Sequence, residues 1–265
     1  MVVIKMYLLV TDETNKTGSD KVKFFIYGGL IVPLKSLLDL NKGVERIREN
    51  AGYKSGDKFK FDTRSRPKQV EIQKATQAKI EVIDLCYSIG CKFLAQASLH
   101  ELIKDRSTED QIEWAANTIF SEFNKYLEKN SSYGLCLMDN IPNKNQWKYL
   151  SEKFCFGLIF PDKKQRKLDR ILVYGATCTN AGHVNSAMDI VLGTFRYCVN
   201  ENLNDLLSKD MLKSVVRLML HHNDGKSVRF TDYGLFLRPK AVNAEHHKKS
   251  YNDLKKRLNT LILSK

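Results

Sequence analysis

Two apolar segments near the N-terminus, separated by a short polar stretch, constrain the fold more than any other part of this sequence. Val2–Val10 and Phe24–Val32 (FFIYGGLIV) are rich in β-branched, aromatic and leucine side chains, which is typical of strands buried on both faces. The connection Asn15–Lys21 is polar and contains glycine, so the two segments are predicted to form an antiparallel hairpin. Gly28-Gly29 lies inside the second segment, which favours close packing or a bulge over a nucleotide-binding loop.

Beyond this hairpin, apolar patterns of helical and strand period alternate along the chain. No stretch rich in Gly, Pro or Ser marks a boundary, so residues 1–265 are predicted to form a single α/β domain with a mixed sheet flanked by helices. A helical extension is expected from about residue 203. The predicted helices are Leu34–Arg48, 67–89, a helix capped by Ser107, Asn143–Lys153, Asn185–Asn200, 203–222 and 240–265, and the further strands are Lys58–Phe61, Cys91–Leu99, Tyr133–Met138 and Ile171–Tyr174.

The charge balance is strongly basic. The chain has 43 Lys and Arg against 30 Asp and Glu, a formal net charge of +13. A basic surface favours polyanionic partners, chiefly nucleic acid, although a generally soluble surface is the open alternative. The surplus is spread over several segments, including 53–68 and 142–170, which suits a folded protein with a basic groove better than one with a basic tail.

Composition also indicates in which cellular compartment the protein is expected. The longest apolar runs are too short to span a bilayer, and Lys5 interrupts the N-terminal run, so neither a membrane span nor a signal peptide is expected. The six cysteines show no paired spacing and several lie in apolar stretches, which favours reduced, buried thiols. No histidine or cysteine spacing typical of a metal site is present. We therefore expect a cytoplasmic protein without structural zinc.

Acidic residues occupy three unusual places. Asp12 and Glu13 directly follow the first predicted strand, Asp139 follows the strand Tyr133–Met138, and Asp189 lies in the apolar run Ala187–Leu192. Acids at the carboxyl ends of buried strands converge where α/β sheets commonly place their active sites. Converging carboxylates suit Mg²⁺ or Mn²⁺, which take oxygen ligands and can act on phosphate esters. The pattern predicts a divalent-metal site.

Each acid also has a structural alternative. Asp12 or Glu13 could open a turn, and Asp139 could belong to an ordinary turn before Pro142. Asp189 could be satisfied by an ion pair with Arg196, which lies on the same face of the predicted helix. The conjunction of all these acids with a basic chain favours the metal interpretation.

Three motifs carry a resemblance to a known family. Thr11-Asp12-Glu13-Thr14 followed by FFIYGGLIVP resembles the opening strands of the domain of unknown function 3800 family, which is grouped with ribonuclease-H-like folds. Asp139 after a strand, with the helix around Ser186-Ala187-Met188-Asp189, is similar to the family's later acidic positions. The segment 233–239 (YGLFLRP) resembles its closing segment. The resemblance implies a ribonuclease-H-like mixed sheet over residues 6–240.

The resemblance also implies site residues. Asp12, Glu13, Asp139 and Asp189 would form the catalytic centre, with Asp12, Asp139 and Asp189 as ligands of Mg²⁺ or Mn²⁺. Lys60, in the predicted strand Lys58–Phe61, would contact a phosphate; a solvated surface lysine is the open alternative. At Ser186 the sequence departs from the family pattern, which commonly has Gln, and Asn185 is a candidate replacement for that amide.

The function predicted from these features is a metal-dependent nuclease that hydrolyses RNA or DNA. Arg196 is a second candidate for substrate binding, although pairing with the buried acid is the stronger expectation. Two alternatives stay open. The first is a catalytically silent nucleic-acid-binding or adaptor protein of the same fold, which Ser186 motivates. The second is a metal-dependent hydrolase of a small phosphorylated substrate.

Overall fold

The fold is taken from a computed structural model of the chain. It describes residues 4–14, 16, 18–19, 22–141, 145–160, 163–178, 181–200, 206–223 and 228–263. Within these ranges no helix is both long and apolar enough to cross a membrane. The predicted strand residues Val2 and Val3 lie outside the described residues.

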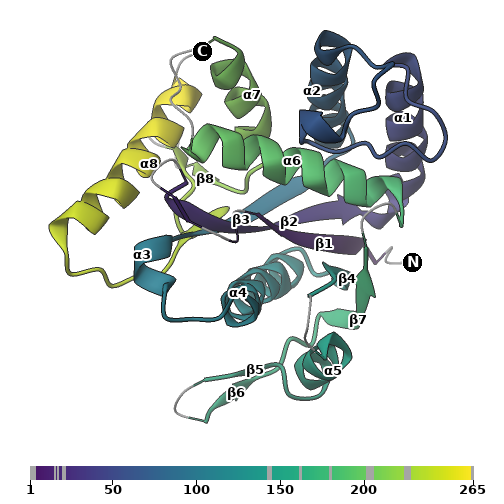
Figure 1. Cartoon of the computed structure of the whole chain (residues 1–265). Helices are drawn as coiled ribbons and strands as arrows, with labels where there is room; N and C mark the ends of the chain where they lie inside the picture. The colour runs from purple at the N-terminus through teal and green to yellow at the C-terminus, as the bar shows by residue number, and fades with distance from the viewer. Residues whose placement is uncertain are drawn as a thin grey trace.

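A six-stranded mixed sheet forms the centre of the molecule (Figure 1). Its strand order is β10-β3-β2-β1-β4-β7; β1, β2 and β3 pair antiparallel, whereas β4, β7 and β10 each join the sheet by parallel pairing. This topology confirms the predicted α/β class, with a mixed sheet flanked by helices and an N-terminal hairpin. The strands are β1 Met6–Thr14, β2 Phe24–Pro33, β3 Lys92–Leu99, β4 Tyr133–Asp139, β7 Ile171–Thr177 and β10 Leu235–Leu237.

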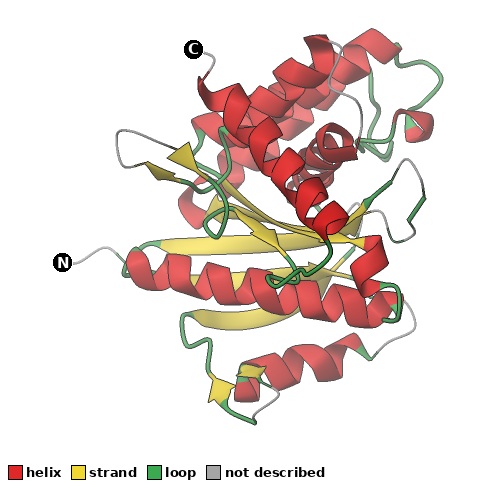
Figure 2. Ribbon diagram, turned by 90° about the vertical axis from the view of Figure 1, so that its left-hand side faces the viewer, coloured by secondary structure: helices red, strands yellow, loops and turns green. Residues whose placement is uncertain are grey.

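Helices cover both faces of this sheet (Figures 1 and 2). One face packs against α1 (Leu37–Asn50), α2 (Ile72–Ser88), α6 (His183–Asn200), α7 (Leu206–Val216) and α8 (Glu245–Leu263). The other packs against α4 (Thr108–Lys129) and α5 (Gln146–Phe156). The remaining elements are short: the 3₁₀ turns Leu34–Ser36 and Thr63–Ser65, the helix α3 (His100–Ile103), and the strand pairs β5 (Leu158–Ile159) with β6 (Gln165–Arg166) and β8 (His222–Asn223) with β9 (Val228–Arg229).

The two cores explain why β2 is apolar at every position. Its side chains alternate between the faces, so that Ile26 and Leu30 join the core under α6 while Phe25 and Ile31 join the core under α4. Its two glycines allow close packing, since a Cβ at Gly28 would lie 2.8 Å from Leu192 Cδ1 and one at Gly29 would lie 2.7 Å from Leu9 Cδ1. The prediction of close packing at this pair is confirmed.

The end of β1 differs from the prediction. The strand continues through Thr14, because residues 11–14 still pair with β2 in the register Thr11↔Gly29 to Thr14↔Ile26. Asp12 and Glu13 therefore lie inside a paired strand and do not follow it. The alternative that they open a turn is wrong, since ladder hydrogen bonds on β2 extend the strand beyond its apolar run.

One predicted strand does not form, and two helix boundaries differ from the prediction. Residues 58–61 form no strand and do not join the sheet; Phe59 is buried against Tyr53. The helix expected from residue 67 begins at Ile72, because Pro67 starts a turn that Val70 N–H closes on its carbonyl. The helix predicted over 203–222 ends at Val216, where the following residues hydrogen-bond with β3 instead; residues 203–205 lie outside the described residues.

Other local predictions are confirmed. Ser107 caps α4 by accepting a hydrogen bond from Asp110 N–H at 3.1 Å. All six cysteines are free thiols; four are buried, whereas Cys155 and Cys178 are exposed. The single-domain organisation with a helical extension from about residue 203 stays a prediction.

Candidate metal centre

Strand pairing brings two of the predicted acids together. β1 and β4 run parallel with Thr11 opposite Met138, so Asp12 and Asp139 are the next residues on adjacent strands. α6 crosses the same face of the sheet and adds Asp189. Asp12, Asp139 and Asp189 line one small pocket together with Lys60. The pocket encloses about 20 Å³, which is room for one water molecule or one ion.

Glu13 approaches the same centre from the neighbouring position on β1. One carboxylate oxygen each from Asp12, Glu13 and Asp139 lie within 4.8 Å of one another. Side chains alternate along a strand, so Glu13 leaves β1 on the side opposite Asp12, although its carboxylate still reaches the cluster. It pairs with Lys16 at 2.5 Å, and its side chain is only 4% exposed. Glu13 is therefore part of the acidic cluster but already has a cationic partner.

The pKa of Asp12 shows that negative charge is unfavourable in this cluster. Burial raises the pKa of Asp12 well above its ordinary value, and the negative charges of Glu13, Asp139 and Asp189 raise it further. A hydrogen bond from Glu13 N–H to Asp12 Oδ1, 2.7 Å long, opposes the shift. Asp12 is the carboxylate that gains most from a nearby cation.

The pKa values of the other two aspartates are also raised, in both cases mainly by burial. The charge of Lys60 lowers each of them in part. Asp189 Oδ2 also accepts a 2.6 Å hydrogen bond from Phe61 N–H. Lys60 and its neighbour thus reach the centre from the loop before α2, although no strand carries them as predicted.

Gly193 makes this loop contact possible. A Cβ at Gly193 would lie 2.4 Å from Phe61 Cβ, so any larger residue would push Phe61 away. The space beside Gly193 is occupied by Phe61, whose backbone N–H donates to Asp189 Oδ2.

Arg196 has a different environment from the one predicted. Its guanidinium carbon lies 5.5 Å from the centre of the Phe61 ring, and it does not line the acidic pocket. Among the described residues no ion pair within 4.0 Å joins Arg196 to Asp189, although its charge does lower the pKa of that acid. Arg196 therefore acts on Asp189 through its charge and packs against the Phe61 ring.

Asn185 and Ser186 both line the pocket at the start of α6. The side-chain amide of Asn185 donates to Thr177 Oγ1 at 2.9 Å and to Cys178 O at 3.2 Å. These bonds connect the end of β7 to α6. The Asn185 amide thus has a positioning role, and Ser186 beside it also lines the pocket.

Sequence reasoning missed a residue that supports Asp139 from behind. Gln146, the first residue of α5, donates from its amide to the Asp139 carbonyl at 2.8 Å and accepts from Ile141 N–H at 3.1 Å. It fixes the backbone after β4 and places α5 beside the acidic centre. No pattern along the chain marks Gln146, because its role depends on how the chain turns between β4 and α5.

The donor set fits a hard divalent cation. Asp12, Glu13 and Asp139 offer carboxylate oxygens at close range, and Asp189 borders the same pocket. Mg²⁺ and Mn²⁺ prefer oxygen ligands and are held by few carboxylates. Buried acids that raise one another's pKa are stabilised when such an ion neutralises them.

Comparisons with known proteins add little to this geometry. No protein-family model matches the chain, and no curated protein matches it. Among solved structures, the ribonuclease H2 from Pyrococcus horikoshii OT3 is similar at 14% sequence identity and a TM-score of 0.38, over 78% of this chain and 86% of that one.

Proposed function

We propose that this chain is a divalent-metal-dependent nuclease of the domain of unknown function 3800 family, hydrolysing phosphodiester bonds in RNA or DNA. The observation that carries the proposal is the partly buried cluster of Asp12, Glu13 and Asp139, bordered by Asp189, inside a chain of net charge +13. A basic surface attracts a phosphate backbone, and the acidic centre suits a metal rather than the phosphate itself.

In this proposal Asp12, Asp139 and Asp189 hold Mg²⁺ or Mn²⁺, which when bound would lower the pKa of water and neutralise charge at a phosphate. Glu13 orients the attacking water or completes the ligand set. Lys60 lies in the wall of the pocket beside the acids, where an ammonium group can contact a phosphate oxygen. Phe61 N–H keeps Asp189 turned toward the pocket.

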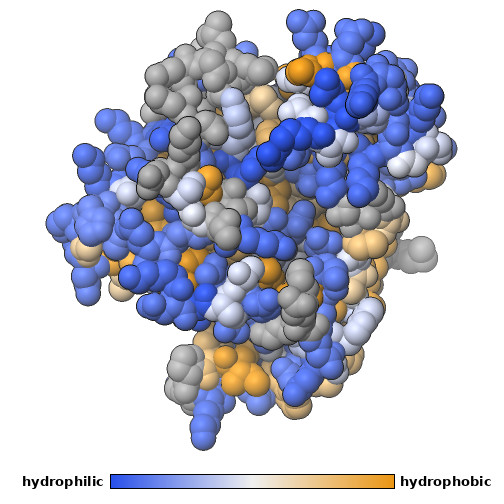
Figure 3. All heavy atoms as spheres, in the orientation of Figure 1, coloured by the Kyte–Doolittle hydropathy of each residue, from blue (hydrophilic) through white to orange (hydrophobic). Residues whose placement is uncertain are grey.

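A second surface supports nucleic acid as the substrate. α5 and β5 expose aromatic and apolar side chains within the basic segment 142–170; Trp147 is 67% and Phe154 is 63% exposed. The apolar atoms at the lower edge of Figure 3 lie where Figure 1 places the β5–β6 hairpin. Exposed aromatics among lysines can stack on unpaired bases while the cations contact phosphates. Gln146 joins this helix to the backbone of Asp139, so the surface begins beside the centre.

Nuclease assays with the full chain test the proposal. Purified protein should cleave labelled single- or double-stranded RNA or DNA with Mn²⁺ or Mg²⁺ and lose this activity in EDTA. Asp12→Asn and Asp139→Asn should each lower the rate at least about a hundredfold, since each removes a charged ligand. Asp169→Asn, at an exposed aspartate, is the matched control. Cleavage that persists in both pocket variants would refute the assignment.

A silent nucleic-acid-binding protein is the second candidate. Two observations favour it: the Asn185 amide is committed to Thr177 and Cys178, and Glu13 is paired with Lys16. This candidate predicts salt-dependent binding without cleavage under any divalent ion. Trp147→Ala should weaken nucleic acid binding under both candidates. Only cleavage of the nucleic acid distinguishes them. A cytoplasmic location remains a prediction for either.

A further inference from the structure

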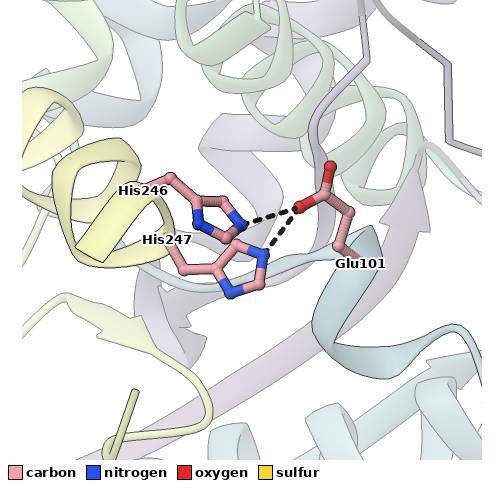
Figure 4. Close-up of side chains that lie close together, drawn as sticks. All are labelled: Glu101, His246 and His247. Carbon is pink, nitrogen blue, oxygen red and sulfur yellow. Dashed lines mark hydrogen bonds and ion pairs between the residues drawn. The ribbon is translucent and has the colours of Figure 1, made fainter. Parts of the chain in front are cut away.

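A second cluster of metal-ligating side chains lies outside the acidic centre, between α3 and the first turn of α8 (Figure 4). Glu101 Oε2 is 2.6 Å from Nε2 of His247 and 3.9 Å from Nε2 of His246. One ligand atom from each of the three residues lies within 4.8 Å of the others. In Figure 4 each imidazole ring turns one nitrogen, its Nε2 atom, toward the Glu101 carboxylate.

These distances are close to those of a tetrahedral metal site. Bonds of about 2.0–2.1 Å from Zn²⁺ to nitrogen and oxygen place the donor atoms about 3.3 Å apart. The observed 2.6 and 3.9 Å separations lie on either side of that value, so small side-chain rotations would equalise them. Glu101 and His246 are exposed and free to adjust, whereas the His247 side chain is only 14% exposed and supplies a fixed ligand.

We propose that Glu101, His246 and His247 bind a borderline divalent cation of the Zn²⁺ class. Two imidazoles with one carboxylate form a donor set that such ions accept, with a fourth position left for water or another ligand. Glu101 and His246 border a hollow of about 480 Å³, which leaves room for that fourth ligand. This set differs from the all-carboxylate centre, which favours harder ions.

The site would join two segments that are 145 positions apart in the chain. α8 is already held in its middle by Tyr251, which donates to the Arg238 carbonyl at 2.6 Å and accepts from Leu99 N–H at 3.2 Å. An ion shared by Glu101 and the two histidines would attach the first turn of α8 to α3 as well. Binding of Zn²⁺ should therefore stabilise the folded chain in addition to occupying the cluster.

Zinc titration tests this inference independently of the proposed nuclease function. The full chain carrying Asp12→Asn and Asp139→Asn removes the competing acidic centre, and calorimetry with ZnCl₂ then reports on the remaining sites. We expect one Zn²⁺ per chain and a higher unfolding temperature with Zn²⁺. In the same background, His247→Ala and Glu101→Gln should each weaken binding at least about tenfold, because loss of even an outer-shell partner has that effect.

His222→Ala provides the matched control, since His222 is an exposed histidine on a different element, β8. It should leave the affinity for Zn²⁺ unchanged. Glu101→Gln keeps the size of an exposed side chain, so it remains informative even if His247→Ala impairs folding. Absence of Zn²⁺ binding, or equal affinity in Glu101→Gln and the parent, would show that the cluster is only a hydrogen-bonded ion pair and would overturn the proposal.

Discussion

Replacing Asp12 by Asn should stabilise the metal-free protein while abolishing its stabilisation by metal. At neutral pH the parent buries the Asp12 charge beside Glu13 and Asp139, with carboxylate oxygens within 4.8 Å. Like charges at that separation repel by about 3.5 kcal/mol when the effective dielectric constant is about 20. Asparagine removes this repulsion and part of the desolvation cost, yet its oxygen can still accept the hydrogen bond from Glu13 N–H.

The sign follows from the raised pKa of Asp12. A carboxyl group whose folded-state pKa lies above its unfolded value binds more protons in the native state, so stability falls as pH rises through that window. At neutral pH the unfolding free energy of metal-free Asp12→Asn should exceed that of the parent by about 1–3 kcal/mol, since partial protonation limits the gain. This corresponds to an unfolding temperature higher by about 2–10 °C.

Differential scanning calorimetry in EDTA and in excess Mn²⁺ provides the measurement. The parent should gain about 2.7 kcal/mol when the free ion is at a hundred times its dissociation constant, and the variant should gain little. Asp169→Asn, at an exposed position, should behave like the parent in both buffers. A variant that is less stable than the parent in EDTA, or equally stabilised by Mn²⁺, would refute this account of the centre.

Three further predictions follow from the same structure. Gly193→Ala should cost about 1–3 kcal/mol in urea unfolding and weaken Mn²⁺ binding, because the new Cβ displaces Phe61 and its bond to Asp189; unchanged stability would contradict the packing at this position. Ser107→Ala should cost about 1 kcal/mol through the lost cap of α4 and leave Mn²⁺ affinity unaltered, so a change in affinity would argue against a purely local role. Because the pKa of Asp12 is raised, calorimetric Mn²⁺ affinity should decline with falling pH at a midpoint above the ordinary aspartate value of 3.8; a midpoint at or below 3.8 would be the contrary result.

Local chemistry made much of the fold predictable. The continuous apolar run of β2 predicted a strand buried on both faces, and the structure places its alternate side chains in two separate cores. The Ser107 cap predicted α4 at its observed start. These signals depend on residues a few positions apart, which is the range over which side-chain period and capping act.

Boundaries were less predictable, because they depend on the partner of each segment. β1 continues to Thr14 since β2 is there to pair with it, although its polar residues resemble a turn. Residues 58–61 resemble a strand but bind Asp189 and the core instead. The helix over 206–216 stops where the chain reaches β3.

The sequence by itself determined which acids could serve a metal: Asp12 and Asp139, next to apolar strand residues, and Asp189 in an apolar helix are costly unless something compensates them. Only the tertiary structure decided the rest. In the folded chain Arg196 packs against the Phe61 ring, and Glu13 pairs with Lys16. Gln146 donates to the Asp139 carbonyl, and Glu101 contacts His246 and His247 from a distant part of the chain. The physical reason is that the neighbours of an acid in the sequence indicate whether its charge will be buried. The interactions that offset the free-energy cost of that burial come from residues that only folding brings into contact.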